Sequence, residues 1–100
     1  MNNSEKLKLI EGSFSYEEAR EVLMELFSAK INFHEMRNFS SRERFGKEDE
    51  NSIKRIALLK ESTKKLAKFL EHAKSGQKKL IINSHIDLIL ADEDSVEVPR

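Results

Sequence analysis

Near its start the chain shows a short alternation of polar and apolar residues. In KLKLIE, residues 6–11, lysine alternates with leucine, and a Gly-Ser pair follows. A period of two places successive side chains on opposite faces of an extended segment, and a Gly-Ser pair interrupts such a segment. The pattern predicts a β-strand over residues 6–11.

The pattern then changes to the period of a helix. Ser15 and Glu18 form a capping-box sequence, in which the two side chains satisfy backbone amides at the start of a helix. The apolar residues that follow are spaced 3, 4, 3, 4 and 3 residues apart: Ala19, Val22, Leu26, Ala29, Phe33 and Met36. This heptad-like spacing predicts a helix over residues 16–37 with one apolar stripe for a partner helix.

A second stretch repeats the same spacing. Its members are Ile56, Leu59, Thr63, Leu66, Leu70 and Ala73. Ser52 is the expected N-cap, and Gly76 is a typical residue for closing the other end. We therefore expect a helix over residues 53–74 that packs antiparallel to the first, with a tip loop over residues 38–51 between them.

The last patterned segment is KLIINSHIDLILA, residues 79–91. One side of it would carry Leu80, Ile82, Ser84, Ile86, Leu88 and Leu90. This alternation predicts a second strand, followed by an acidic tail over residues 92–100 that is expected to fray. The chain is thus expected to be a single α+β domain of order β-α-α-β. In it, an antiparallel two-helix hairpin packs on a small antiparallel sheet.

The two predicted strands differ in length. At ~3.3 Å per residue, residues 79–91 span roughly 40 Å and residues 6–11 about 20–25 Å. Part of the longer strand then lacks a partner within the chain, unless residues 1–5 extend the first strand. An apolar, unpaired strand edge favours pairing with another copy. We expect a homodimer formed through the C-terminal strand. The alternative is a monomer whose second strand is shorter than its pattern.

The composition limits the classes of function. The 100 residues, enough for one domain, include 18 basic and 18 acidic side chains, so the net charge indicates neither a nucleic-acid nor a membrane partner. Cysteine is absent, which excludes disulfides, thiolate metal sites and a cysteine nucleophile. We see no leader-like segment and no apolar run near the ~20 residues of a membrane span, and therefore expect a cytoplasmic protein.

Cationic side chains gather toward the end of the first predicted helix and in the predicted tip loop. They are Lys30, His34, Arg37, Arg42 and Arg44. Together they could bind a small anion, aided by the capping-box sequence SSRE at residues 40–43, whose helix amides would also attract one. The simpler alternative is that the helix dipole favours cations here and that the acidic tail, expected at the same end, pairs with them.

Basic residues also dominate the second helical segment. Residues 52–79 hold nine Lys and Arg but only two Glu. Four lysines cluster on the side opposite to the apolar stripe: Lys54, Lys64, Lys65 and Lys68. A lysine-covered face suits the phosphates of a nucleic acid or another polyanion, although most such faces only keep a helix solvated.

Motifs that carry chemistry are few. His85 and Asp87 share one side of the second predicted strand, but we find no third metal ligand beside them. No hydrolase, phosphate-loop or dinucleotide motif occurs, so we assign no catalytic residue, no metal and no cofactor. The sequence favours a small self-associating protein-interaction module. The alternatives are a dimeric polyanion binder and a site for a small anionic ligand at the hairpin tip.

Overall fold

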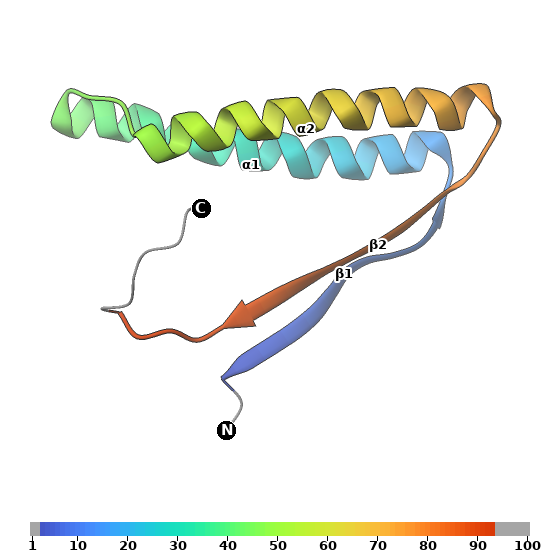
Figure 1. The fold of residues 1–100 in the computed structure, drawn as a ribbon, viewed down its shortest axis with the longest axis horizontal. Helices are drawn as coiled ribbons and strands as arrows, with labels where there is room; N and C mark the ends of the chain where they lie inside the picture. Colours follow the sequence, from blue (N-terminus) through green and yellow to red (C-terminus); the bar gives the residue numbers. More distant parts are fainter. Residues whose placement is uncertain (1–2, 94–100) are drawn as a thin grey trace.

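The computed structural model describes residues 3–93, in the order β1 (Ser4–Phe14), α1 (Tyr16–Phe45), α2 (Glu50–Ser75) and β2 (Leu80–Ile89). The two helices form an antiparallel hairpin, and the two strands form an antiparallel ribbon (Figure 1). The predicted α+β class and the β-α-α-β order are confirmed. The acidic tail expected over residues 92–100 lies mostly outside the described residues.

Helix α1 begins where the sequence indicates. The Ser15 hydroxyl accepts a hydrogen bond from the Glu18 N–H (3.2 Å), and the Glu18 carboxylate accepts one from the Ser15 N–H (2.9 Å). The second of these bonds is the main reason why the pKa of Glu18 is lowered. The predicted capping box is therefore present, and it sets the first turn of α1.

Helix α1 ends later than expected. It continues to Phe45 and closes at Gly46, which adopts the left-handed conformation (φ 68°) typical of a helix terminus. The predicted end at residue 37 and the predicted tip loop over residues 38–51 are therefore wrong. Neither Gly nor Pro interrupts the sequence before Gly46, so the helix has no reason to stop earlier. The SSRE sequence lies inside α1 and starts no helix of its own.

Helix α2 starts at Glu50, earlier than expected, because Asp49 rather than Ser52 caps it. The Asp49 carboxylate accepts hydrogen bonds from the Ser52 N–H (3.4 Å) and from the Ser52 hydroxyl (3.1 Å). All six residues of the predicted apolar stripe of α2 are buried or half-buried, as a seam against α1 requires. The helix ends at Ser75, before Gly76.

Helix α1 meets α2 through a different stripe from the one that the spacing predicts. Its buried and half-buried side chains over the length of the hairpin include Leu23, Phe27, Ile31, His34, Asn38 and Ser41. Asn38 secures this side near the tip, since its side chain donates to the Glu48 carboxylate and accepts from the Asp49 N–H. Phe33 and Met36, expected in the seam, are exposed instead.

The ribbon is paired over the whole length of both strands. Its register runs from Ser4 opposite Ile89 to Phe14 opposite Leu80. β1 has 11 residues and β2 has 10, so the predicted difference in strand length, and the unpaired stretch that it implied, is wrong. A β-bulge between Lys8 and Ile10 restores the alternation after the Leu-Ile pair and lets β1 continue to Phe14.

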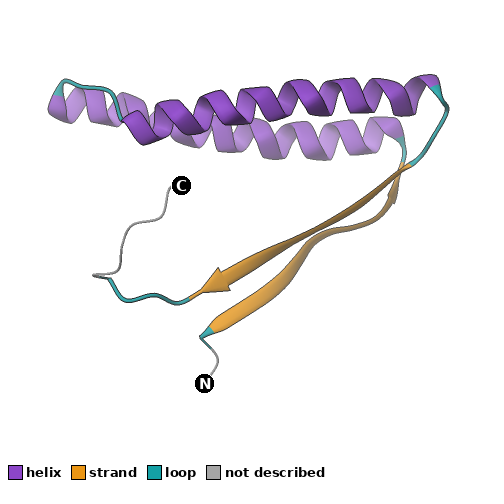
Figure 2. Ribbon diagram, viewed as in Figure 1, coloured by secondary structure: helices purple, strands orange, loops and turns teal. Residues whose placement is uncertain are grey.

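The hairpin and the ribbon pack on each other at one end only. There Ala19, Leu70, Ala73 and Leu80 are buried, and Phe14, Tyr16, Met24, Leu66 and Ile82 pack around them. From this closed end the two layers diverge toward the hairpin tip and the far end of the ribbon (Figure 2). The molecule is a thin, open wedge with extents of 49 × 41 × 15 Å.

Candidate functional site

The ribbon turns one apolar face toward the opening of the wedge. Directly opposite residues of paired strands share a face, so Leu7 and Ile86 lie on the same face as the core residue Leu80. Along this face of β2 the exposed fraction rises from 8% at Leu80 to 38% at Ile86 and 51% at Leu88. We call Leu7, Ile86 and Leu88 the strand wall. It is an apolar surface of the kind found in a core, but the hairpin does not cover it.

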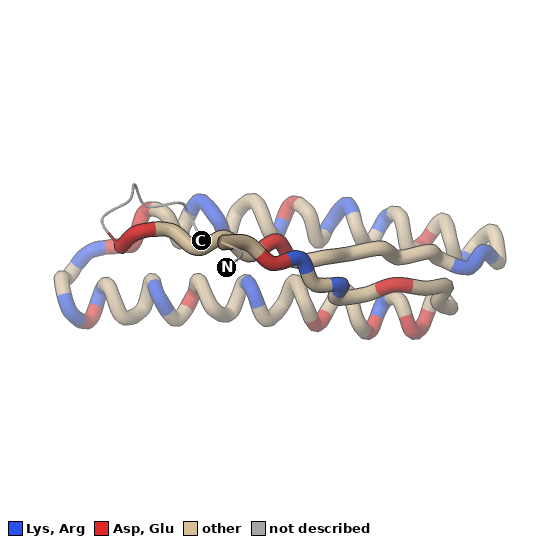
Figure 3. The backbone as a smooth tube through the Cα atoms, turned by 90° about the horizontal axis from the view of Figure 1, so that it is seen from below, with Lys and Arg blue, Asp and Glu red and all other residues tan. Residues whose placement is uncertain are grey.

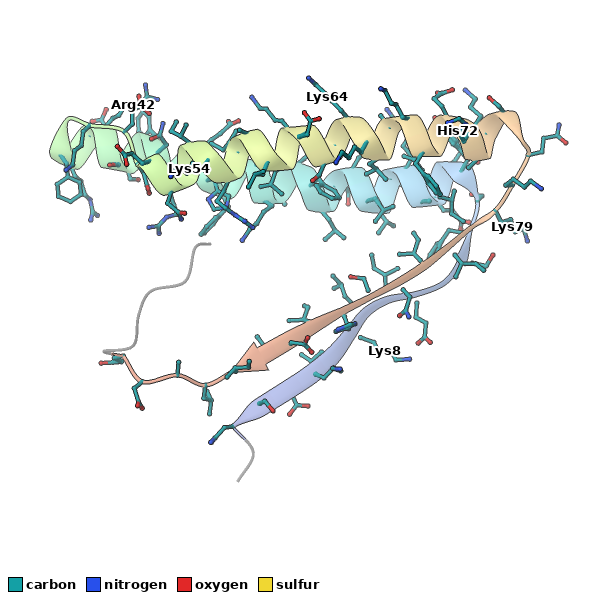
Figure 4. The ribbon with its side chains drawn as sticks, in the orientation of Figure 1. Lys8, Arg42, Lys54, Lys64, His72 and Lys79 are labelled. Carbon is teal, nitrogen blue, oxygen red and sulfur yellow. The ribbon has the colours of Figure 1, made fainter. Side chains whose placement is uncertain are left out.

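The hairpin faces the opening with apolar residues as well. Ala19, Leu26 and Phe33 are seven residues apart and so lie along one side of α1, which is buried at Ala19 and exposed further along. On α2, Phe69 borders the cavity that Leu80 lines, and Leu58 lies three turns before it on the same side. We call Leu26, Leu58 and Phe69 the helix wall. Side chains of both layers point into the wedge (Figure 4).

The chain exposes far more surface than a compact chain of its mass. Its accessible surface is 8469 Å². A compact monomer of 11.6 kDa would expose about 5,800 Å². The radius of gyration is 17.1 Å, against about 13 Å for a compact chain of this length. The excess, roughly 2,600 Å², includes both apolar walls.

The three cationic residues expected toward the end of the first helix all lie around the Phe33 ring, but only Lys30 and Arg37 remain accessible there. His34 is fully buried between the helices, with its ring edge-on to Phe33 at 5.1 Å between centroids. The Lys30 ammonium lies 5.0 Å from the centre of the Phe33 ring, and the Arg37 guanidinium lies 5.9 Å from it. His34 is not accessible to an anion, because its side chain is buried against α2. The predicted apolar stripe had placed it on the exposed flank of the helix.

The cations near the tip also separate. Arg42 pairs with Glu48 at 3.7 Å and does not border the cavity found near the tip. That cavity, of about 530 Å³, is a shallow groove along the last turns of α1, which we call the tip groove. Its lining includes Phe33, Met36, Arg37, Ser40, Arg44 and Phe45, together with one carboxylate, that of Asp49. Two of the five predicted anion-binding residues, Arg37 and Arg44, therefore share one surface.

The predicted lysine face of α2 is exposed. Lys54, Lys64, Lys65 and Lys68 are all solvent-accessible, and none forms an ion pair within residues 3–93. Lys64 points away from the hairpin (Figure 4). Acidic and basic positions are nevertheless interspersed along both helices (Figure 3), which dilutes the charge of this face.

The two residues singled out on the second strand, His85 and Asp87, are exposed and lie close together. His85 Nε2 lies 3.5 Å from Asp87 Oδ2, and the same aspartate lies 3.9 Å from the Lys6 ammonium. Over residues 3–93 there is no group of three or more His, Asp or Glu side chains that could hold a metal ion. This face of the ribbon, opposite to the strand wall, is solvated and mixed, since it also carries the exposed Ile81 and Ile89.

The sequence carries one signal for the apolar walls besides the heptad spacing. Between Leu23 and Ile31, α1 has a second apolar stripe beside the predicted one, through Phe27. A helix with two apolar stripes needs two partners to cover them. In the structure one stripe meets α2, and the other faces the opening of the wedge or the tip groove.

The chain was compared with protein-family models, with curated proteins and with solved structures, and none of them matches it. Among the described residues, no helix has the length and apolar character needed to cross a membrane.

Proposed function

We propose that this chain is a self-associating protein-interaction module of the cytoplasm, in which a second copy covers the two apolar walls. The observation that carries the proposal is the exposure of the strand wall and the helix wall on opposite sides of one opening. Each wall continues the buried core at the closed end, so each has the composition of an interior rather than of a solvated surface.

The exposed area favours a second copy as the occupant. The excess of roughly 2,600 Å² per chain, about 5,200 Å² for two chains, reaches the upper end of the roughly 2,000–5,000 Å² that the two partners of a permanent homodimer bury together. A two-stranded ribbon is also marginally stable when isolated. Among the described residues β2 pairs only with β1, so its outer edge can still accept a strand from another copy. A two-fold arrangement through β2 would cover both features in each copy.

Paired aspartate substitutions on β2 test this proposal. Leu88 belongs to the strand wall, whereas Ile89 lies on the opposite face. Both side chains are exposed in the single chain, so neither substitution removes a buried contact. We expect Ile89→Asp to sediment as a dimer and Leu88→Asp to sediment as a monomer with unchanged helical circular dichroism. A dimer that persists in Leu88→Asp would refute the use of this wall.

One observation supports a second candidate function, polyanion binding. The lysine face of α2 is solvent-accessible and holds no ion pair among the described residues. If this face binds phosphates, the double variant Lys64→Gln, Lys68→Gln should elute from a heparin column at lower salt than the unaltered chain. The matched control is Lys6→Gln, Lys8→Gln on the ribbon. Equal shifts in both double variants would assign the retention to bulk charge.

A further inference from the structure

The tip groove combines apolar and cationic side chains in an order that suits one kind of partner. We propose that it binds an acidic amphipathic helix of a partner protein. The groove lies at the hairpin tip and shares no residue with the strand wall, although its Phe33 lies on the same side of α1 as Leu26 of the helix wall.

The spacing of the groove residues supports a helical partner. Phe33, Arg37, Ser40 and Arg44 follow one another at intervals of 4, 3 and 4 residues, so they form a line along one side of α1. The two arginines are seven residues apart, a rise of about 10 Å. Carboxylates seven residues apart on a partner helix have the same separation. The partner's apolar seam would then lie on Phe33 and Met36.

The shape of the groove disfavours a small molecule. Met36 and Phe45 line it but are each more than half exposed, so the groove is wide and shallow. Pockets for small ligands enclose most of the ligand's surface, whereas an amphipathic helix needs only a strip of apolar contact with charges at its margin.

The arginines of the groove could form ion pairs with acidic side chains of a partner. Arg44 forms no ion pair within residues 3–93. Arg37 Nε lies 3.7 Å from Asp49 Oδ2, a partly exposed contact of the kind that contributes little and exchanges readily. The Phe33 ring beside the Arg37 guanidinium limits the freedom of that side chain. Arg44 can therefore pair with a partner carboxylate directly, whereas Arg37 would exchange or share its contact with Asp49.

Two synthetic helical peptides test the proposal directly. Each has three heptads with leucine at the seam positions, and the flanking positions carry glutamate in one peptide and lysine in the other. Fluorescence anisotropy should show binding of the glutamate peptide to the full chain and more than tenfold weaker binding of the lysine peptide, because like charges would meet at Arg37 and Arg44. Failure of the glutamate peptide to bind, or equal binding of both peptides, would overturn the proposal.

Single substitutions in α1 test whether the peptide binds at the tip groove. Arg44→Gln should weaken binding of the glutamate peptide roughly threefold, the effect of losing one exposed charge pair. Met36→Glu should abolish detectable binding. The control is Arg42→Gln, since Arg42 occupies the same turn but does not border the groove. A loss of affinity in Arg42→Gln equal to that in Arg44→Gln would show attraction by general charge and contradict the proposal. Sedimentation of the same variants reports self-association separately.

Discussion

Replacing Leu70 with alanine tests whether the closed end alone joins the two layers of the wedge. Leu70 is 2% exposed and is the largest apolar side chain of the small core, where it lies with Ala19, Ala73 and Leu80. The substitution removes three carbon groups, worth ~0.8 kcal/mol each in lost burial. The cavity left behind adds to this, and the expected loss in free energy of unfolding is about 3–4 kcal/mol.

Urea unfolding followed by circular dichroism measures this loss. The expected cost is a large part of the roughly 5–15 kcal/mol that stabilises an ordinary domain. Leu58→Ala is the control on the same helix, because Leu58 is exposed in the single chain and carries no core contact there. Both substitutions are compared in a background that carries Leu88→Asp, so that self-association does not contribute to stability. If Leu70→Ala then lowers the free energy of unfolding no more than Leu58→Ala does, the assignment of the core is refuted.

Two further predictions concern the helix ends. The pKa of Glu18 is lowered by its capping bonds, so its contribution to stability is present above the unfolded-state pKa of about 4.3 and is lost as pH falls through the lower folded-state value. Glu18→Gln should therefore flatten the acid side of the stability curve, and an unchanged acid side would contradict this. Gly46→Ala should cost about 1 kcal/mol in urea unfolding, because alanine is strained at φ 68°; an unchanged midpoint would argue against that conformation.

Local signals in the sequence were sufficient to predict the order of the elements and the face of α2 that packs against α1. The capping box at Ser15 is a short-range hydrogen-bonding pattern, and it appears in the structure as expected. The apolar stripe of α2 was predicted correctly from its heptad spacing, although Leu58 and Phe69 lie outside it on the same helix. Alternation in residues 79–91 was equally clear, although β2 itself stops at Ile89.

The choice between the two apolar stripes of α1 could not be made from spacing alone. Both stripes satisfy helical periodicity, and the deciding contacts involve Asn38 with Glu48 and Asp49, which are ten and eleven residues away in sequence. The same choice withdrew His34 from the predicted anion site and left Arg37 with Arg44. A candidate site on a helix therefore depends on the rotation of that helix, which its tertiary partners set.

The shape of the wedge was also beyond local reasoning. The sequence predicts a hairpin lying on a sheet, and packing of this kind is present only around Leu80 and Ala19. β1 extends beyond the predicted residues 6–11 at both ends, which removed the strand mismatch on which the expectation of a dimer first rested. The case for self-association now rests on the exposed walls instead.

Sedimentation equilibrium of the unaltered chain is the most direct test of that case. If a second copy covers the strand wall and the helix wall, the measured mass is twice the 11.6 kDa of one chain over a wide range of dilution. A mass of one chain at all concentrations, with the radius of gyration of 17.1 Å retained in small-angle scattering, would contradict the account.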